Sequence, residues 1–507
     1  MRESKGGRVP FFYSHLVKNV FLLVLSFIGI PVSATIVLLS LAVTKLRAGR
    51  DVPSKRTQIQ IQAQKDAASQ RKTILVTGVS MTKGLAIARV LSQHTSHRII
   101  GADISSLSPG RFSSAIAKYY RLEAPHGDDA EPYIDSILSI IRSEKVDLWI
   151  SCSSVLAAVE DGQVVRLAEA QALSHGRRFE AIQFDEHVVE KFHEKDKFID
   201  YIASLNLPIP ESYRCTSAEQ ALNILLRDFD GKDGTTLGKK YIMKPIGVDD
   251  HARNNMMTLL PFPTADKTST YIRNLNISRT NPFQLQQFIQ GKEYCTHALV
   301  IRGQVKAFTS CPSSELLMHY EPLPAYSSLS QEMLKFTERV VSHGGETFTG
   351  HLSFDFLVSE EADGELSFYP IECNPRAHTA VVLFAQTPEM ADAYLSIFGK
   401  STLESVPVFP RAPTYSYYWI GHDLIEFVLL PILEFLFAKG AWDSVVRGIK
   451  TFLYHVVYWR DGTFALEDPL PFFVLYHLYW PARFVESLRL GKGWSRINVS
   501  TTKMFSD

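Results

Sequence analysis

The sequence predicts a protein of mixed α/β (α+β) class that carries one N-terminal transmembrane helix. Lys72–Gly78 reads as a buried strand ending in glycine, Met81–Leu91 as a helix with apolar periodicity, and Arg98–Asp103 as a second strand. Gly291–Ile301 instead reads as one of several later antiparallel strands joined by turns. Val20–Val43 is almost entirely apolar. A βαβ opening followed by antiparallel strands favours an N-terminal Rossmann-like domain and a second, α+β part.

Length and composition limit the classes of protein that fit. A chain of 507 residues suits roughly three domains of about 150 residues each. Lys plus Arg and Asp plus Glu both number 53, so no basic excess supports nucleic-acid binding. The five cysteines are scattered without a CxxC pair, which argues against a disulfide framework or a zinc site and favours reduced thiols.

The N-terminal apolar run is long enough to cross a bilayer. No charged residue occurs from Asn19 to Thr44. At about 1.5 Å per residue this run exceeds a hydrocarbon core of about 30 Å. Val32-Ser33-Ala34 resembles a signal-peptidase site, but the apolar run continues well past it, which a cleaved signal peptide would not do. Basic residues flank both ends, so charge does not orient the helix. We expect a single-pass membrane protein.

Changes in composition suggest four parts. Residues 1–71 comprise the anchor, with its span near 20–43, and a polar linker; 72–184 form the βα domain; 185–405 form the second domain; 406–507 form a C-terminal region rich in aromatics. Two interpretations of that last region remain open. It packs on the rest of the protein as core, or it rests on the membrane beside the anchor, where Trp and Tyr are favoured.

The first strand–helix turn resembles a dinucleotide-binding loop only in part. Gly78 to Gly84 lacks the full GxGxxG spacing, so we interpret it as a structural turn. For the same reason Asp103, at the end of the second strand, is not assigned to a ribose.

A predicted hairpin late in the chain carries a set of oxygen donors. Asp355 lies on the first strand and Glu372 on the second, with Asn374 two residues further on. If the strands pair, the three side chains converge, and oxygen donors of this kind suit Mg²⁺. Arg376 adds a permanently charged planar fork beside them. Taken alone, the hairpin fits equally well a turn with solvated acids.

Three more elements precede this hairpin in a fixed order. Lys197 lies early in a helix whose N-cap is Asp185, Lys244 ends a buried strand, and Gln286–Glu293 links two strands. Lysine is mostly exposed in proteins, so each lysine alone is more simply a solvated surface charge. Lys244 fits this reading less well because its strand is otherwise buried.

The order of these elements resembles that of the ATP-grasp superfamily over about residues 72–405. The resemblance implies a pre-ATP-grasp domain followed by an ATP-grasp fold whose two lobes clasp ATP. It implies that Lys197 and Lys244 bind the phosphates, with Lys191 and Lys195 as rivals for the role of Lys197.

The resemblance also implies the remaining ligands of the nucleotide. The hinge residues Gln286, Gln287 and Ile289 would bind adenine, and Glu293 would bind the ribose hydroxyls. Asp355, Glu372 and Asn374 would hold Mg²⁺, or Mn²⁺ in its place, between the phosphates.

Arg376 would stabilise the transferred phosphoryl group or an oxyanion. One departure from the family is a glycine-poor flap: 246–253 contains a single glycine, and Arg253 is a candidate substitute for its backbone amides.

Several phrases narrow the resemblance to mycosporine-glycine synthases and related fungal-type ATP-grasp enzymes of natural-product pathways. They include Gly291-Lys292-Glu293-Tyr294-Cys295-Thr296-His297 and Ile371-Glu372-Cys373-Asn374-Pro375-Arg376-Ala377-His378. Mycosporine-glycine synthases join glycine to 4-deoxygadusol. The implied reaction phosphorylates an enolic or carboxylate oxygen of an acceptor with ATP, after which an amino-acid amine displaces phosphate.

The partners expected on this basis are a small-molecule acceptor, an amino acid and the membrane, with the catalytic domain in the cytosol and a homodimer left open. His378 and His297 are acid/base candidates because histidine titrates near neutral pH; a packing role is equally open for His297. Ser313, Ser314 and Glu315 are candidates for contact with the amine, or form a plain turn.

Alternative functions remain. They are an amide-forming carboxylate–amine ligase, a nucleotide-binding regulator without catalysis, and a Rossmann oxidoreductase. The regulator is disfavoured by the complete set of lysines and acids, and the oxidoreductase by the missing glycine pattern.

Overall fold

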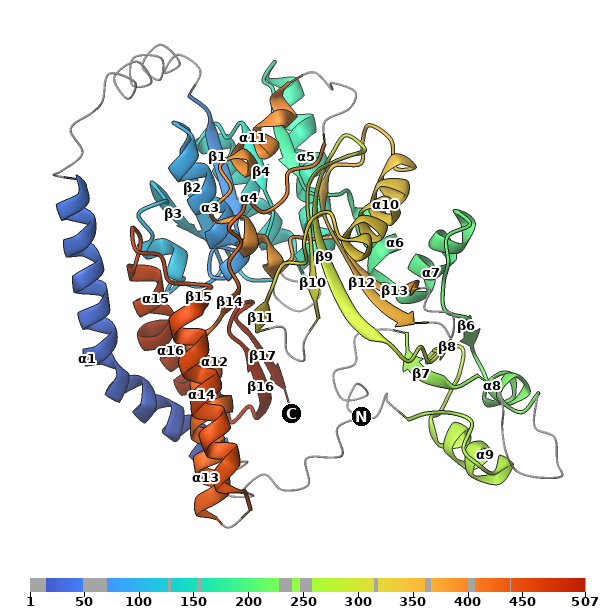
Figure 1. Cartoon of the computed structure of the whole chain (residues 1–507). Coiled ribbons are helices and arrows are strands. Elements are labelled where there is room, and N and C mark those ends of the chain that lie inside the picture. The colour runs from blue at the N-terminus through green and yellow to red at the C-terminus, as the bar shows by residue number, and fades with distance from the viewer. Residues whose placement is uncertain are drawn as a thin grey trace.

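The structure of the chain is a computed structural model, shown in Figure 1. It describes residues 15–48, 71–125, 129–152, 157–227, 239–246, 258–313, 318–360, 366–399, 406–437 and 439–506. Most of the polar linker, the flap residues 247–253, Ser314 and Glu315 lie outside these ranges.

The N-terminal domain is a five-stranded parallel sheet in the order β3-β2-β1-β4-β5. Helices alternate with its strands, as the βαβ opening predicted, so the Rossmann-like expectation is confirmed. The strands are β1 (Thr73–Thr77), β2 (Arg98–Asp103), β3 (Lys118–Arg121), β4 (Leu148–Ile150) and β5 (Glu180–Ile182), and the helices are α3 (Thr82–His94), α4 (Glu131–Ser143) and α5 (Ala158–Ser174).

The turn after β1 is held by the protein itself. Gly78 has φ +70°, and a Cβ there would lie 2.5 Å from the Cys152 carbonyl oxygen, so only glycine fits. The buried Asp103 carboxylate accepts hydrogen bonds from the Ser80 amide at 2.8 Å and the Ser80 hydroxyl at 2.6 Å. A carboxylate committed in this way closes the turn, in agreement with the structural interpretation of this loop.

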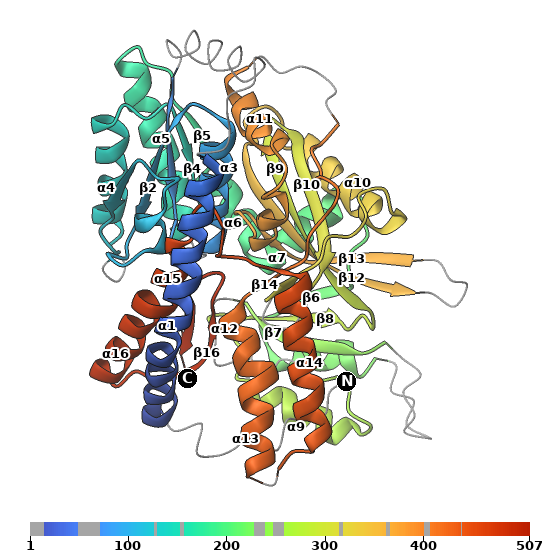
Figure 2. The ribbon, with the colours of Figure 1, turned by 60° about the vertical axis from the view of Figure 1, so that its left-hand side comes forward.

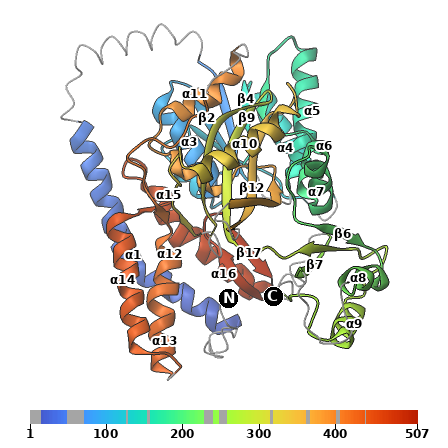
Figure 3. The same cartoon turned by 45° about the vertical axis from the view of Figure 1, so that its right-hand side comes forward.

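Two antiparallel sheets follow. A small lobe contains the sheet β6-β8-β7, made of β6 (Ser212–Cys215), β7 (Tyr241–Pro245) and β8 (Phe283–Gln287), with α8 (Ala218–Leu225) and α9 (Ala265–Asn274). A large lobe contains the sheet β10-β9-β12-β13. In Figures 1 and 3 the small lobe lies below the large sheet at the lower right. The mixed α/β class, with two lobes after a parallel domain, is therefore confirmed.

The large sheet is built from long, well-paired strands. They are β9 (Lys292–Ile301), β10 (Gln304–Pro312), β12 (Gly350–Glu360) and β13 (Leu366–Asn374). The helix α10 (Ser328–Ser342) packs on β9 and β10. Phe354 and Phe356 are fully buried against Phe336 of α10, with ring centroids 5.1 Å apart in both pairs. This aromatic core holds the sheet face opposite the acids in place.

Two expectations about local structure were wrong. The strands β8 and β9 do not pair: β8 pairs with β6 and β7, because the short segment 288–291 carries the chain from one lobe to the other. The single helix expected after Asp185 is two helices, α6 (Glu186–His193) and α7 (Lys195–Ser204), separated by the extended residue Glu194. The Asp185 cap itself is confirmed, since its side chain accepts from the Val188 amide at 2.8 Å.

The C-terminal region packs on the rest of the protein and does not stand apart. Its strand β14 (Tyr417–Tyr418) pairs with β11 (His319–Tyr320) and with β15 (Arg460–Asp461). Arg89 of α3 donates from Nε to Asp468 at 2.9 Å, and both side chains are buried. The fully buried Trp419 belongs to the same core cluster as the strands of the N-terminal sheet.

The helix α1 (His15–Ala48) lies along this region (Figure 2). It packs on α16 (Trp480–Leu490) and α15 (Leu470–Val474), while α13 (Leu430–Leu436) and α14 (Trp442–Tyr458) pack on each other. Two π-helices lie in this region. η9 (Leu424–Leu429) leads directly into α13, and η10 (Leu475–Tyr479) connects α15 to α16.

Candidate active site

Two acids face each other on neighbouring strands of the large sheet. Asp355 of β12 and Glu372 of β13 are register partners, and a bulge follows Asp355 directly. Asn374 donates from Nδ2 to Asp355 Oδ2 at 3.3 Å. The three predicted metal ligands therefore lie together, and their oxygen atoms suit a hard cation such as Mg²⁺.

Two negative charges at this pair are unfavourable unless a cation compensates them. Burial raises the pKa of Asp355 well above its ordinary value, and the negative charges of Glu372 and Glu293 raise it further, against the opposing effect of Arg376 and Lys195. Two carboxylates brought this close favour shared protons or a bound cation. The site is thus suited to a divalent metal by the chemistry of its own residues.

A lysine from α7 meets these acids, and it is Lys195. Its Nζ lies 3.3 Å from Glu372 Oε2, with both side chains about a third exposed or less (26% and 33%). Lys197 points elsewhere and pairs with Glu194 at 2.8 Å on the exposed side of the helix. Residues two apart on a helix do not share a face, so the two lysines cannot serve the same site.

The third lysine of this stretch also lies elsewhere. The Lys191 ammonium sits 3.5 Å from the ring centroid of Tyr201 in a cation–π contact. Of the three rivals, the structure therefore brings only Lys195 to the acids. The break at Glu194 starts α7 at Lys195, and no glycine or proline marks that break in the sequence.

The small lobe contributes a second lysine. Lys244 of β7 donates from Nζ to Gln286 Oε1 of the neighbouring β8 at 2.6 Å. Burial and, to a smaller extent, the positive charge of Lys195 lower the pKa of Lys244 to about 8. The two lysines therefore act on one another from separate lobes. A polyanion held between them would relieve both the burial cost and the repulsion.

The predicted hinge residues end the last strand of the small lobe, Gln286 and Gln287 in β8, and begin the crossing to the large lobe at Ile289. Gln286 is buried, and its side-chain amide forms hydrogen bonds with Lys244 and Ser212. Ile289, three residues further on, is also buried. Gln287 has a structural commitment, because its Oε1 accepts from the Glu211 amide at 3.2 Å. Glu293 is exposed at the start of β9 and accepts from the Ser313 hydroxyl at 3.0 Å.

Arg376 follows the acids in a tight turn. Its Nη1 donates to Asn374 Oδ1 at 2.9 Å, and its amide donates to the Asn374 carbonyl at 2.8 Å. These bonds link the guanidinium to the ligand that also contacts Asp355. The side chain is partly exposed, at the edge of the acid pair.

The rings of His297 and His378 each accept a hydrogen bond from a backbone amide. The His378 amide donates to His297 Nδ1, and the Ala380 amide donates to His378 Nδ1, each at 3.3 Å. Each Nδ1 is thus an acceptor, which assigns the ring proton to Nε2. Burial lowers the pKa of both rings to about 3, with help from nearby positive charges. Neutral imidazoles of this kind donate from Nε2 and are poor bases near pH 7.

One residue that the sequence analysis did not select as a site residue also reaches this place. Lys83, at the start of α3, is buried, and its Nζ donates to the Ala377 carbonyl at 2.9 Å. Burial and the charge of Arg376 lower the pKa of Lys83 to about 7. In the sequence Lys83 is one residue of the helix predicted over Met81–Leu91, with nothing local to mark it. Lys83 comes near the site only because the N-terminal domain packs against the turn that follows the large sheet.

No protein-family model matches the sequence, and no curated protein matches it. Solved structures do match. N5-carboxyaminoimidazole synthetase from Staphylococcus aureus is 14% identical over 65% of this chain and 78% of its own, with a TM-score of 0.43. Biotin carboxylase from Campylobacter jejuni is 14% identical over 66% of this chain and 72% of its own, with a TM-score of 0.47.

The L-amino acid ligase from Bacillus licheniformis is also similar, with 14% identity over 60% of this chain and 67% of its own and a TM-score of 0.38. At these identities and TM-scores no site residue or substrate passes from these proteins to this chain. The assignment of the site depends on the chain's own side chains.

Proposed function

We propose that this chain is an ATP-dependent ligase that activates an acceptor oxygen by phosphorylation and couples it to an amine. The observation that carries the proposal is that Lys195 contacts Glu372 of the acid pair, while the charge of Lys244, from the other lobe, interacts with both Lys195 and Glu372. A magnesium–nucleotide complex requires carboxylates that bind the metal and cationic side chains that bind the phosphates.

Each predicted residue has a role in this proposal. Asp355, Glu372 and Asn374 hold Mg²⁺, for which Mn²⁺ can substitute, and the metal neutralises charge on the phosphates. Lys195 and Lys244 bind the phosphates, with Lys195 in the role first expected of Lys197. Gln286 and Ile289 line the adenine side, with Gln287 holding the hinge backbone, and Glu293 meets the ribose.

The remaining residues serve the acceptor. Arg376 stabilises charge on the transferred phosphoryl group or on the acceptor oxygen. His378, with its ring proton on Nε2, is the candidate hydrogen-bond donor to the acceptor, and His297 supports it by accepting from the His378 amide. Lys83 lies close by, with its Nζ on the Ala377 carbonyl. A site lined with donors favours an acceptor rich in oxygen, such as an enolate or carboxylate. The resemblance to mycosporine-glycine synthases adds the enolic acceptor 4-deoxygadusol, glycine and a role in secondary metabolism.

The reaction is tested with the full chain in detergent. ATP, Mg²⁺, glycine and a panel of enolic and carboxylate acceptors are supplied, and ADP, AMP and phosphate are measured. The proposal expects ADP and phosphate to form only when acceptor and amine are both present. AMP as the product would reject phosphoryl transfer. Saturable ATP binding with no turnover on any acceptor would favour the regulator, and a carboxylate as the accepted substrate would favour the amide-forming alternative.

We further propose that α1 attaches the protein to a membrane. Its candidate span, His15–Arg47, has a mean hydropathy of 2.5 with 11% of the most apolar window buried. A single helix of this kind also fits a signal sequence, so the proposal depends on a second observation. The α13–α14 pair of the C-terminal region and its connecting residues also expose apolar side chains, namely Leu436, Phe437, Trp442, Leu453, Val457 and Tyr458.

Polar contacts tie α1 to the protein along its length. Asn19 accepts from Trp494 Nε1 at 3.1 Å, Ser26 donates to the Tyr476 carbonyl at 2.7 Å, and Thr44 donates to the Leu466 carbonyl at 3.1 Å. The apolar side chains of α1 that stay exposed between these bonds are the surface that would meet lipid. Membrane pelleting that resists alkaline carbonate is expected for the full chain; release by carbonate would contradict the attachment.

A further inference from the structure

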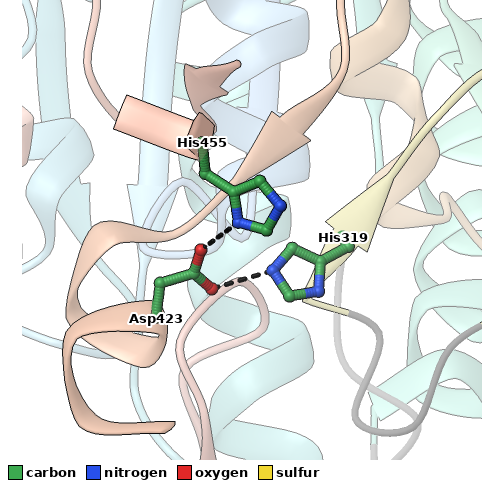
Figure 4. Close-up of side chains that lie close together, drawn as sticks. All are labelled: His319, Asp423 and His455. Carbon is green, nitrogen blue, oxygen red and sulfur yellow. Dashed lines mark hydrogen bonds and ion pairs between the residues drawn. The ribbon is translucent and has the colours of Figure 1, made fainter. Parts of the chain in front are cut away.

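A compact group of metal-ligating side chains lies outside the candidate active site. His319 comes from β11, Asp423 ends α12 (Ile420–Asp423), and His455 lies in α14. Figure 4 shows the two imidazoles directed at opposite oxygens of the one carboxylate. His319 Nε2 lies 2.8 Å from Asp423 Oδ1, and His455 Nδ1 lies 2.6 Å from Asp423 Oδ2.

The group is enclosed but reachable. The side chain of Asp423 is fully buried, that of His455 is 10% exposed, and that of His319 is 22% exposed. The Trp459 ring closes over both imidazoles, with centroids 4.4 Å from His455 and 5.6 Å from His319. A buried carboxylate is costly unless it is compensated by close partners. The exposed edge of His319 leaves a route for an ion and for a water ligand.

The ligand set and its geometry suit a transition metal. Two imidazole nitrogens and a carboxylate oxygen form a common three-ligand set for Zn²⁺, with a fourth position left for water. The three ligand atoms all lie within 4.8 Å of one another. Zn²⁺ bonds of about 2.0–2.1 Å separate tetrahedral ligands by roughly 3.3 Å, so small side-chain rotations would open the two N–O contacts and close the N–N distance.

Two neighbouring features favour a site over a simple hydrogen-bonded contact. The π-helix η9 begins directly after Asp423, and π-turns occur frequently at functional sites. A further imidazole, that of His422, lies with its centroid 6.0 Å from the His319 ring. A nitrogen-rich set of this kind differs from the all-oxygen set of Asp355, Glu372 and Asn374, so the two sites would select different metals.

We propose that His319, Asp423 and His455 bind one divalent transition-metal ion, for which Zn²⁺ is the best match. The ion fastens β11 to two helices of the C-terminal region. Tyr320, which follows His319, packs edge-on to His378 with centroids 5.7 Å apart. The metal therefore steadies the strand that supports the candidate acceptor side of the active site. Its role is structural, and it does not depend on the proposed reaction.

The experiment uses the full chain in detergent, stripped with a chelator and then titrated with Zn²⁺ alone in the presence of excess Mg²⁺. Excess Mg²⁺ keeps the carboxylate pair of the other site from competing. We expect about one tightly bound Zn²⁺ per chain and a rise in thermal unfolding temperature. Stoichiometry is measured by elemental analysis after gel filtration.

Matched variants decide the assignment. His319→Gln keeps an N–H donor for Asp423 but is a poor metal ligand, so it should fold and bind Zn²⁺ at least about a hundredfold more weakly. His455→Gln should lose binding in the same way. His187→Gln, at an exposed position in α6, should bind as the original chain does. Unfolding temperatures of the metal-free variants show whether each is folded.

Two results would overturn the proposal. The first is no saturable Zn²⁺ binding by the folded original chain. The second is binding that is unchanged in both glutamine variants. Either would leave the three side chains as a hydrogen-bonded network that holds β11 without a metal.

Discussion

The candidate nucleotide site and the His319–Asp423–His455 group both surround a buried carboxylate with nitrogen donors, yet the chain assembles them differently. Asp355 and Glu372 lie opposite one another on adjacent strands of one hairpin, so pairing alone brings them together. The second group joins side chains 104 and 32 positions apart in the sequence, from a strand and two helices. A hairpin motif is visible in the sequence, whereas a group made by docking is not.

The largest effect is expected at the acid pair, where a double substitution should abolish one site and leave the other intact. Glu372→Gln with Asp355→Asn keeps the shapes of the side chains and removes their charge. We expect ADP formation to fall about a thousandfold or more, since a catalytic metal contributes several kcal/mol. Zn²⁺ binding at the second group should not change. Glu332→Gln, at an exposed ion pair in α10, is the control, and undiminished turnover in the double variant would exclude the metal assignment.

A matched pair of lysines gives the next effect. Lys195→Met should raise the KM for ATP and lower kcat/KM about a hundredfold, because it removes a charge that faces the acids. Lys197→Met should stay within about twofold, since an exposed ion pair contributes little. Steady-state kinetics with ATP as the varied substrate measures both. The reverse ranking would return the phosphate role to Lys197.

The pH dependence of nucleotide binding sharpens the comparison further. Burial lowers the pKa of Lys244 from 10.5 to about 8 in the free protein. Charging Lys244 therefore weakens folding below about pH 8, and this penalty is relieved as pH rises toward 10.5. A bound triphosphate favours the charged form, so binding at pH 8.5 should take up part of a proton. Calorimetry in buffers of different ionisation enthalpy measures this, and the uptake should disappear in Lys244→Met. Proton release would contradict the account.

The smallest effect is expected at His378. Its pKa of about 3 predicts no inflection of kcat near pH 6.5 that belongs to this ring. His378→Asn retains a side-chain N–H donor, so activity should fall by no more than about tenfold. An inflection near pH 6.5 that disappears in the variant would make His378 a general acid or base.

The sequence allowed the α/β class, the parallel opening and the acid hairpin to be predicted, because each depends on local periodicity or on one strand pair. It did not identify Lys195, since the break at Glu194 carries no glycine or proline. It did not separate β8 from β9 either. A four-residue crossing between lobes looks like a hairpin turn when only neighbouring residues are considered.

Contacts between distant segments were the other part that sequence reasoning could not reach. Lys83 becomes relevant only because α3 docks against the turn at Ala377. For the C-terminal region, packing as core and resting on the membrane both stayed open from the sequence; in the structure Arg89 and Asp468 join it to the first domain through a buried ion pair. Tertiary packing decides such contacts, and no pattern in one segment reports them.

Equilibrium binding of ATP to the full chain, with and without Mg²⁺, tests the central claim most directly. The account predicts saturable binding of about one nucleotide per chain that is strengthened by Mg²⁺ and lost when Lys195 and Lys244 are both changed to Met. Absence of binding by the folded protein, or binding that is indifferent both to Mg²⁺ and to the two lysines, would contradict it.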